Sequence, residues 1–496
     1  MYRMTRLLFN LPAATCLLAV ACMTGSVRAA EEKKEDTSEV PAPPPENGGT
    51  ESKSRISDTY IPLQLQDFPE RPAPLLEIGQ HFLGTGPIDQ GFTIPGGEVW
   101  QPYLMVFGNV RTGVQTFESP ASRLSEWANR IDLFANLYLT FTERIVAGIR
   151  PLDRGGRFTS YTIDPKPANG KSFNDRDINA EITTLFFEGD FGELFPFLDP
   201  SDRHGWDYGM SVGRQVISFQ DGMLINDNLD AAGITKINWK IFSAINFRWT
   251  LLYAWNQVNR NGLPGNALDE KGSLVGLFTE SDYRHSTISV DAVFVNGNDA
   301  IGKGIYAGIS TVQRWGGLNT TFRVLGSAPV KKMTGTNTRG VLVHSDISWT
   351  PGGGNNFMYL ALFAGIGKFR SAARDPSVGG PLAPQAGVLF AGVGLGRYGS
   401  ALSNSADNMA GATIGYEMFF DDTRQQLLFE LGGRYSKDDF NQTAGAFGAT
   451  YQIAVGRRLV FLLGGFGTYQ QGITVAGVKQ DNKFLSSGRF EIMLQM

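Results

Sequence analysis

The stretch NRIDLFANLYLTFTERIVAGIR, residues 129–150, alternates apolar and polar side chains in steps of two. Every second residue over 131–141 is apolar, and residues such as Arg130 and Asp132 lie between them. After a two-residue break at Thr142–Glu143 the pattern resumes. Side chains of a strand point to opposite faces with period two, and this period is too strict for a helix. The stretch therefore predicts a tight hairpin with one apolar face and one mostly polar, charged face. In a soluble sandwich the apolar face would meet a second sheet, and in a membrane it would meet lipid while the polar face lined a lumen.

The same pattern continues from Trp100 to Met496 in segments of roughly eight to fifteen residues. We expect strands at residues 103–117, 129–141, 144–151, 177–188, 206–219, 233–242, 246–257, 273–282, 286–296, 304–315, 318–329, 340–350, 356–368, 408–420, 426–437, 443–456, 459–471 and 484–496. The expected fold class is all-β, an antiparallel β-barrel of about 18 strands, or 16 if one pair of segments is merged.

The breaks between these segments alternate in length. Every second break is short, as at 142–143 and 316–317, whereas the others are longer, notably 152–176 and 369–407. Break 189–205 is long where a short turn is expected. Short turns at one end and long loops at the other describe a transmembrane barrel of the outer-membrane type. Beyond the first 29 residues no apolar run is long enough for a spanning helix, so a membrane would be crossed by strands of a closed barrel.

The N-terminus has the layout of a secretory signal peptide. Arg3 and Arg6 precede an apolar run, and small residues follow around a cleavage site after Ala29. The alternative is a lipoprotein that is cleaved before Cys22. The only two cysteines, Cys16 and Cys22, lie inside residues 1–29, so cleavage after Ala29 leaves no thiol for a disulfide, a metal or catalysis.

The remaining chain divides by composition. Residues 30–60 are charged and Pro-rich, which predicts a disordered linker. Residues 61–98 are apolar but interrupted by proline, which predicts an irregular ordered segment, and residues 99–496 form the barrel. Taking the three arginines of residues 1–29 from the 44 basic residues leaves 41 against 48 acidic residues, a net charge of −7. This charge disfavours a nucleic-acid partner.

The last expected strand, 484–496, is amphipathic to the final residue. It resembles the terminal signal of Gram-negative outer-membrane barrels, although that pattern ends in Phe or Trp and this chain ends in Met496. Aromatic residues also gather near the strand ends, as in interfacial girdles: Trp100, Trp127, Trp206, Trp249, Trp255, Trp315, Trp349, Tyr416 and Phe420. The resemblance implies the cell outer membrane as location and its lipid as partner.

A second resemblance is more specific. Gly213-Arg214-Gln215, followed by FQDGMLINDN, resembles the corresponding stretch of alginate-export-like and related specific porins. It covers about fifteen residues and implies a substrate-specific channel. Trimers are common among such barrels, so a homo-oligomer is compatible with the resemblance, but the sequence shows no interface.

No motif of metal binding or haem attachment occurs in the sequence. The four histidines, His81, His204, His285 and His344, are not paired at helical spacing, and neither HExxH nor CxxCH is present. We therefore predict no catalytic residue, metal ligand or cofactor, and no enzyme. An outer-membrane enzyme acting on lipid stays open as an alternative, because a Ser/His pair needs no local signature.

The polar faces of the expected strands supply the candidate site. The residues expected to line a pore are Arg111, Arg130, Asp132, Arg144, Arg150, Glu181, Lys236, Arg248, Arg323, Glu430 and Arg434. They could simply pair across strands and solvate a lumen. Alternatively, the arginines of the first three strands line a pathway, since arginine binds carboxylate or phosphate with two parallel hydrogen bonds. The resulting hypothesis is a channel for passive diffusion of a small polar or anionic solute; a closed barrel that acts as a scaffold or surface interaction protein is the other reading.

The break 369–407 is long enough to have a function of its own. Folding inward, covering the mouth and contacting a partner all remain open from the sequence. Its basic residues Arg370, Arg374 and Arg397 are expected to be solvated, and we assign no site there.

Overall fold

The computed structural model describes residues 73–79, 90–120, 122–140, 142–154, 157–165, 179–198, 205–260, 268–297, 302–330, 339–382, 384–391, 394–436, 443–472, 474–475, 478–479 and 481–496. The predicted signal peptide and linker lie outside these residues. So does much of the segment 61–98. These domain boundaries therefore stay predictions.

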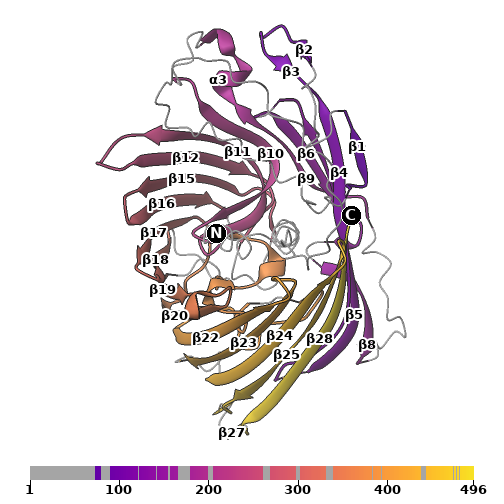
Figure 1. Ribbon diagram of the computed structural model, residues 1–496. Helices are drawn as coiled ribbons and strands as arrows, with labels where there is room; N and C mark the ends of the chain where they lie inside the picture. Colours follow the sequence, from indigo (N-terminus) through magenta and orange to yellow (C-terminus); the bar gives the residue numbers. More distant parts are fainter. Residues whose placement is uncertain are drawn as a thin grey trace, which may run out of the picture.

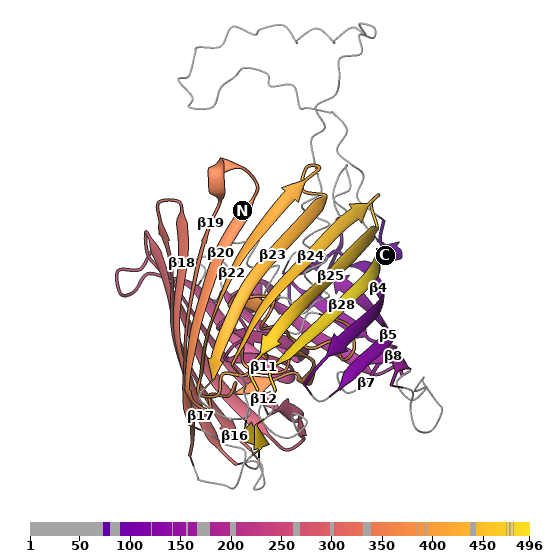
Figure 2. The ribbon, with the colours of Figure 1, turned by 90° about the horizontal axis from the view of Figure 1, so that it is seen from below.

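Eighteen antiparallel strands close into a barrel (Figures 1 and 2). They are β4 (Tyr103–Glu118), β5 (Arg123–Tyr138), β6 (Arg144–Ile149), β9 (Ile182–Asp190), β10 (Tyr208–Phe219), β11 (Ile225–Trp239), β12 (Asn246–Trp255), β15 (Ser273–Asp282), β16 (Ser286–Asn296), β17 (Gly304–Trp315), β18 (Leu318–Pro329), β19 (Gly340–Trp349), β20 (Phe357–Gly367), β22 (Met409–Phe420), β23 (Gln425–Ser436), β24 (Ala444–Val455), β25 (Leu459–Gln470) and β28 (Lys483–Gln495). The last strand pairs with the first, from Gly488↔Thr116 to Gln495↔Asn109, so the wall has no free edge there. The predicted fold class is confirmed.

Shorter elements accompany these eighteen strands. They are β1 (Leu76–Ile78), β2 (Phe92–Thr93), β3 (Val99–Trp100), β7 (Asp153–Arg154), β8 (Arg157–Asp164), β13 (Val258–Asn259), β14 (Leu268–Asp269), β21 (Ala373–Arg374), β26 (Thr474–Val475), β27 (Val478–Lys479), α3 (Phe191–Leu194) and the 3-10 turns Pro196–Leu198, Pro351–Gly353, Pro376–Val378 and Pro384–Ala386. Among the described residues, no helix is long and apolar enough to cross a membrane.

The wall has an apolar outer face and an interior face that carries buried polar groups. On β17 and β25, for example, Ile305, Ile309 and Leu463 are more than half exposed. Residues that point inward, such as Arg323 of β18 and Glu430 of β23, are almost fully buried, whereas their neighbours Phe322 and Leu431 are exposed. This division is the one that lipid outside and a polar interior require.

The β10–β11 hairpin leaves the wall and enters the barrel. Strand β9 pairs with β10 only as far as Arg214, and β12 pairs with β11 only from Asp230 onward. Residues 215–229, which we call the hairpin tip, pair with each other and cross the interior (Figure 1). The sequence predicted this strand to begin at 233, and it begins at Ile225, because the tip gains sheet pairing inside the barrel.

An apolar core holds the hairpin tip against one side of the wall. Ile217 and Leu229 of the tip pack with Leu274, Val293 and other buried residues of β12–β17. The ring of Phe219 stacks on that of Phe278, with centroids 3.4 Å apart. The interior of the barrel on this side is therefore a packed core, although the sequence predicted a polar lining throughout.

A second insertion follows β20. Residues 369–408, which we call the lumen segment, pack Phe369, Leu382 and Phe390 against wall residues including Leu325 and Leu342. Its strand β21 pairs in parallel with the start of β11. Of the three arrangements that the sequence left open, the segment adopts the inward fold.

Candidate functional site

Four arginines and two carboxylates gather on the interior side of β28, β4, β5 and β6. The Nε atom of Arg111 lies 2.5 Å from Glu491 Oε1. Asp132 receives two hydrogen bonds from Arg130, at 2.6 and 3.0 Å, and one from Arg150 at 2.7 Å. Arg489 lies 3.9 Å from Glu491. We call these six residues the arginine cluster.

The strand register brings the cluster together. Arg111 and Arg130 are direct partners across β4 and β5, and Asn109 is opposite Asp132. Like charges directly opposite each other are destabilising unless acids compensate them. Two carboxylates and four guanidinium groups make up the cluster, so the formal charges of these six side chains sum to +2. Because Arg130 and Asp132 are at most 5% exposed, solvent screens this charge less than it would at the surface.

The other predicted site residues do not join this cluster. Arg144 pairs with Glu188 at 2.5 Å and Arg248 with Glu280 at 3.0 Å, both in partly exposed surroundings. Lys236 and Glu181 also lie apart from the cluster. Lys236 lies on the same face of β11 as the exposed Ile234 and donates to the carbonyl oxygen of Asp207 at 2.9 Å. Glu181 is exposed just before β9.

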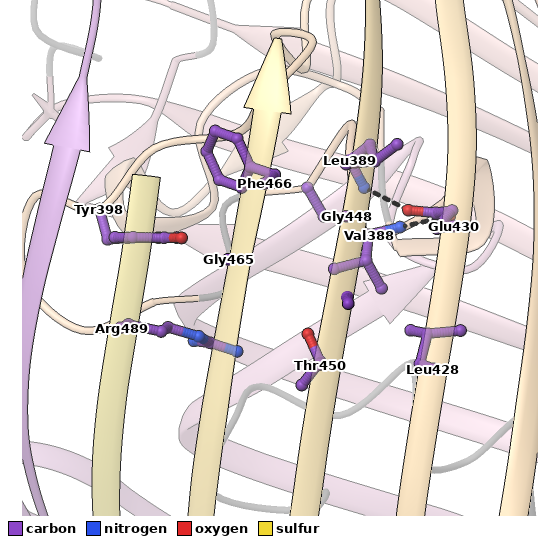
Figure 3. Close-up of a pocket in the computed structure, with 12 residues that line it drawn as sticks. Val388, Leu389, Tyr398, Leu428, Glu430, Gly448, Thr450, Gly465, Phe466 and Arg489 are labelled. Atoms are coloured by element: carbon purple, nitrogen blue, oxygen red, sulfur yellow. Dashed lines mark hydrogen bonds between the residues drawn. The ribbon is translucent and has the colours of Figure 1, made fainter. Parts of the chain in front are cut away.

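Three further predicted residues hold the inserted segments. Glu430 accepts hydrogen bonds from the amides of Val388 and Leu389, at 3.0 and 2.7 Å (Figure 3). Arg434 donates to the carbonyl of Leu402. Arg323 donates to Gln220 at 3.1 Å and pairs with Asp221 of the hairpin tip. These side chains therefore satisfy buried groups of the lumen segment and the hairpin tip, which would otherwise be left without partners.

Arg374 was expected to be solvated, and that expectation is wrong. The side chain is 1% exposed and donates to carbonyls of both inserted segments: Gly222 of the hairpin tip, and Gly379 and Leu382 of the lumen segment, at 3.1 and 3.4 Å for the latter two. A planar guanidinium has five donors in a fixed arrangement, which suits several carbonyls at once. No spacing in the sequence signals this role, because the partners are backbone atoms and one of them, Gly222, is 152 residues away in the chain.

The other two arginines of the lumen segment also have partners. Arg370 pairs with Asp407 near the start and end of the segment. Arg397 donates from its amide and from its side chain to Glu126, at 2.7 and 3.1 Å, and its side chain remains half exposed. The expectation of solvated charges is thus wrong for Arg370 and only partly right for Arg397.

A narrow pocket separates the lumen segment from the wall. Val388, Leu389, Tyr398, Phe466 and Arg489 are among its lining residues (Figure 3). The guanidinium of Arg489 lies 5.7 Å from the centre of the Tyr398 ring. One member of the arginine cluster therefore contacts the lumen segment directly.

A pair of carboxyl groups lies outside the membrane-spanning strands. Glu98 follows the turn of the β2–β3 hairpin, and Glu143 ends the β5–β6 turn, where it accepts bonds from the Thr142 hydroxyl at 2.7 Å and the Asp190 amide at 3.2 Å. Burial first, and a hydrogen bond to Glu143 second, raise the pKa of Glu98 to about 7. Burial acts against the ionised form of Glu143 as well, but its hydrogen bonds lower its pKa on balance.

Histidine shows no metal-site geometry in the part of the chain that the structure describes. His344 lies with Nε2 3.3 Å from the Gln385 carbonyl oxygen, and no group of three or more His, Cys, Asp or Glu residues there could hold an ion. His81 and His204 lie outside the described residues.

Comparison with known proteins identifies the fold alone. No protein-family model and no curated protein matches the chain. Among solved structures, OccK2 (OpdF) of Pseudomonas aeruginosa is similar with a TM-score of 0.53 and 11% identity, covering 82% of this chain and 100% of that one. A BenF-like porin from Pseudomonas fluorescens Pf-5 has a TM-score of 0.52 and 11% identity over 79% and 98% of the two chains. OccAB2 of Acinetobacter baumannii has a TM-score of 0.52 and 10% identity over 79% and 98% of the two chains. The chain thus has the fold of these Gram-negative outer-membrane porins.

Proposed function

We propose that this protein is an outer-membrane channel through which a small, preferentially anionic solute diffuses passively. The arginine cluster is the observation that carries the proposal. Its net charge of +2 lies on the interior face of β28–β6, the side of the barrel opposite the apolar core of β12–β17. A fixed positive charge in a narrow, poorly screened passage favours anions over cations.

The geometry of the cluster also favours carboxylates. Each guanidinium presents parallel N–H donors that match two carboxylate oxygens, and Arg130 already binds Asp132 in this way. A solute carboxylate can exchange for a protein carboxylate without leaving either charge unpaired. Two similar structures contain carboxylates: OccK2 in complex with glucuronate, and OpdK with vanillate, both from Pseudomonas aeruginosa. Each matches this chain with a TM-score of 0.51, at 11% and 10% identity.

The inserted segments support a selective rather than a general channel. The hairpin tip and the lumen segment fill the interior beside β12–β24 and are joined to each other by β21. The lumen segment also reaches β5 and β28, where Arg397 pairs with Glu126 and Tyr398 lies against Arg489. A solute that passes this segment would therefore pass close to the arginine cluster.

Planar-bilayer recording tests the proposal. We expect discrete conductance steps, and a reversal potential in a salt gradient that indicates preference for anions. Arg130→Gln should reduce that preference, whereas Arg144→Gln, which removes a partly exposed pair with Glu188, should change it little. Unchanged selectivity in the first variant would overturn the assignment to the cluster. A folded barrel that never conducts would favour the closed scaffold instead.

A further inference from the structure

The β2–β3 hairpin, residues 90–101, packs against the end of the barrel that carries the short turns. The Gln101 amide donates to the carbonyl oxygen of Leu139, which follows β5, at 2.8 Å. At the tip of the hairpin, Gly96 lies so close to α3 that an added Cβ would be 3.3 Å from the Leu194 carbonyl oxygen. Figure 1 shows β2, β3 and α3 on the same side of the barrel. The hairpin is therefore docked on two parts of the barrel that are distant from it in the chain.

Two buried carboxyl groups meet where the hairpin docks. Glu98, between β2 and β3, is 8% exposed, and Glu143, between β5 and β6, is fully buried. Glu98 Oε2 accepts a hydrogen bond from Trp100 Nε1 at 3.0 Å, whereas its Oε1 has no donor among the described residues. A side-chain hydrogen bond joins Glu98 to the Glu143 carboxyl. Two ionised carboxylates only accept hydrogen bonds, so this bond requires a proton.

The donors around the pair decide which carboxyl holds that proton. Glu143 accepts from the hydroxyls of Thr140 and Thr142 and from the amide of Asp190, and such donors favour an ionised carboxylate. Glu98 is less well supplied, since one of its oxygens is left without a donor. Glu98 is therefore the acid of the pair and Glu143 the carboxylate. This assignment agrees with the opposite directions in which the two pKa values shift.

Further acids surround the pair. Glu193 of α3 lies close enough to act on Glu98 electrostatically. Behind Glu143, the carboxyl oxygens of Asp190 and Asp207 lie on either side of Gly192, where an added Cβ would be 3.3 and 3.1 Å from them. Loss of the proton from Glu98 thus adds a negative charge to a region that is already acidic.

The basic residues of the adjoining strands are bonded elsewhere. Arg144 Nε lies 2.5 Å from Glu188 Oε1, and Lys236 donates to the carbonyl oxygen of Asp207 at 2.9 Å. Ionisation of Glu98 therefore places a second carboxylate against Glu143. Movement of the hairpin away from the barrel separates the two charges and returns Glu98 to water.

We infer that the Glu98–Glu143 pair is a proton-dependent latch, which holds the β2–β3 hairpin on the end of the barrel and releases it when Glu98 loses its proton. Burial first, and the bond to Glu143 second, raise the pKa of Glu98 to about 7. Against an ordinary value of about 4.3, ionisation weakens docking about 500-fold, since each pKa unit is a factor of ten. Docking is complete at acidic pH and is lost as pH rises through 7. The latch works in the same way in a conducting and in a closed barrel.

Hydrogen exchange of the full chain, folded in lipid vesicles, tests the latch. The Ile94 amide donates to the Glu98 carbonyl oxygen at 2.9 Å, and the Gln101 amide donates to Leu139, so both report docking of the hairpin. Their exchange is compared at about pH 5.5 and about pH 8.5 after correction for the intrinsic rate at each pH. We expect protection of both amides to fall by up to about 500-fold at the higher pH, while amides of β5 keep theirs.

Two variants separate the latch from a general effect of pH. Glu98→Gln supplies a donor that does not titrate, so the hairpin should stay protected at both pH values. The matched control is Glu193→Gln, which removes a neighbouring acid but not the bond, and it should keep the loss of protection.

Three results would overturn the latch. The first is equal protection of the hairpin at both pH values in the parent protein, and this comparison decides even if a variant does not fold. The second is a loss of protection that persists in Glu98→Gln. The third is full recovery of protection at the higher pH when Ca²⁺ is added, because a cation rather than a proton would then join the two carboxyl groups.

Discussion

Arg374→Met is the sharpest test of how the interior is held together. This side chain donates to Gly222, Gly379 and Leu382, and it thereby links the hairpin tip to the lumen segment. Methionine is apolar and matches the aliphatic stem of arginine but not its guanidinium, so it makes none of these bonds. Three buried carbonyl groups then lose a donor.

The magnitude follows from burial. A hydrogen bond from a charged donor contributes about 1.5–3 kcal/mol, but burying the guanidinium costs part of that gain. A buried acceptor left without a donor costs about 1–3 kcal/mol, so losing the donor of three carbonyls should cost about 3 kcal/mol or more in total. Taking 3 kcal/mol, a state in which the two segments are separated gains about a hundredfold in population, since each 1.4 kcal/mol is a factor of ten.

Single-channel recording reads this population directly. We expect Arg374→Met to visit a state of higher conductance about a hundred times more often than the parent protein. Arg248→Met is the control, because it breaks a partly exposed pair with Glu280 on the wall and should cost about 1 kcal/mol or less. Unchanged gating in a correctly folded Arg374→Met barrel would refute the idea that this residue links the insertions.

Three other predictions use the same fold. The folded state keeps Glu98 protonated up to pH about 7. Its contribution to stability is therefore complete below the unfolded pKa near 4.3 and is lost as pH rises towards 7. In thermal unfolding, Glu98→Gln should not show this loss of stability with rising pH. Glu430→Ala removes the acceptor of two amides of the lumen segment and should lower the unfolding free energy by about 2–4 kcal/mol in denaturant titration; a smaller loss than 1 kcal/mol would contradict it. Gly365→Ala places a Cβ 1.8 Å from the Ala406 carbonyl and should displace the lumen segment and raise conductance, whereas Gly326→Ala meets nothing within 4 Å and should not.

Much of the barrel was predictable because period-two alternation has a direct physical cause. Each strand from β15 to β20 lies within about a residue of its predicted bounds, since lipid outside and polar groups inside fix the parity of every position. The prediction was less accurate for β11, which is longer than expected at its start. Residues 225–232 read as a loop because their apolar partners, such as Leu274 and Val293, are supplied by other strands. Strand β8, residues 157–164, lies inside a long predicted break and was missed for a similar reason. It pairs with residues 125–129 of β5, beyond the part of β5 that pairs with β6.

The candidate site was predictable only in part. Parity alone places Arg111, Arg130 and Asp132 on one face, and the register then joins them. Parity could not show that Glu430 binds amides of the lumen segment, because those amides are more than forty residues away in the chain. A buried charge on a barrel wall looks the same in sequence whether it faces solute or an inserted loop.

The structure gives a physical criterion for separating these two kinds of charge. On the wall from β12 to β17 the interior residues are largely apolar and form a core with the hairpin tip. Arg323 lies at the edge of this core and binds the tip itself. On β28–β6, by contrast, Arg111, Arg130 and Arg150 are held by side chains of the wall, with bonds such as Arg111–Glu491 and Arg150–Asp132. Charges whose partners belong to the wall keep their places when the inserted segments move, whereas charges whose partners belong to an insertion lose them. Selectivity should therefore follow the first group and gating the second, so that Arg130→Gln and Arg374→Met should alter reversal potential and open-state frequency separately.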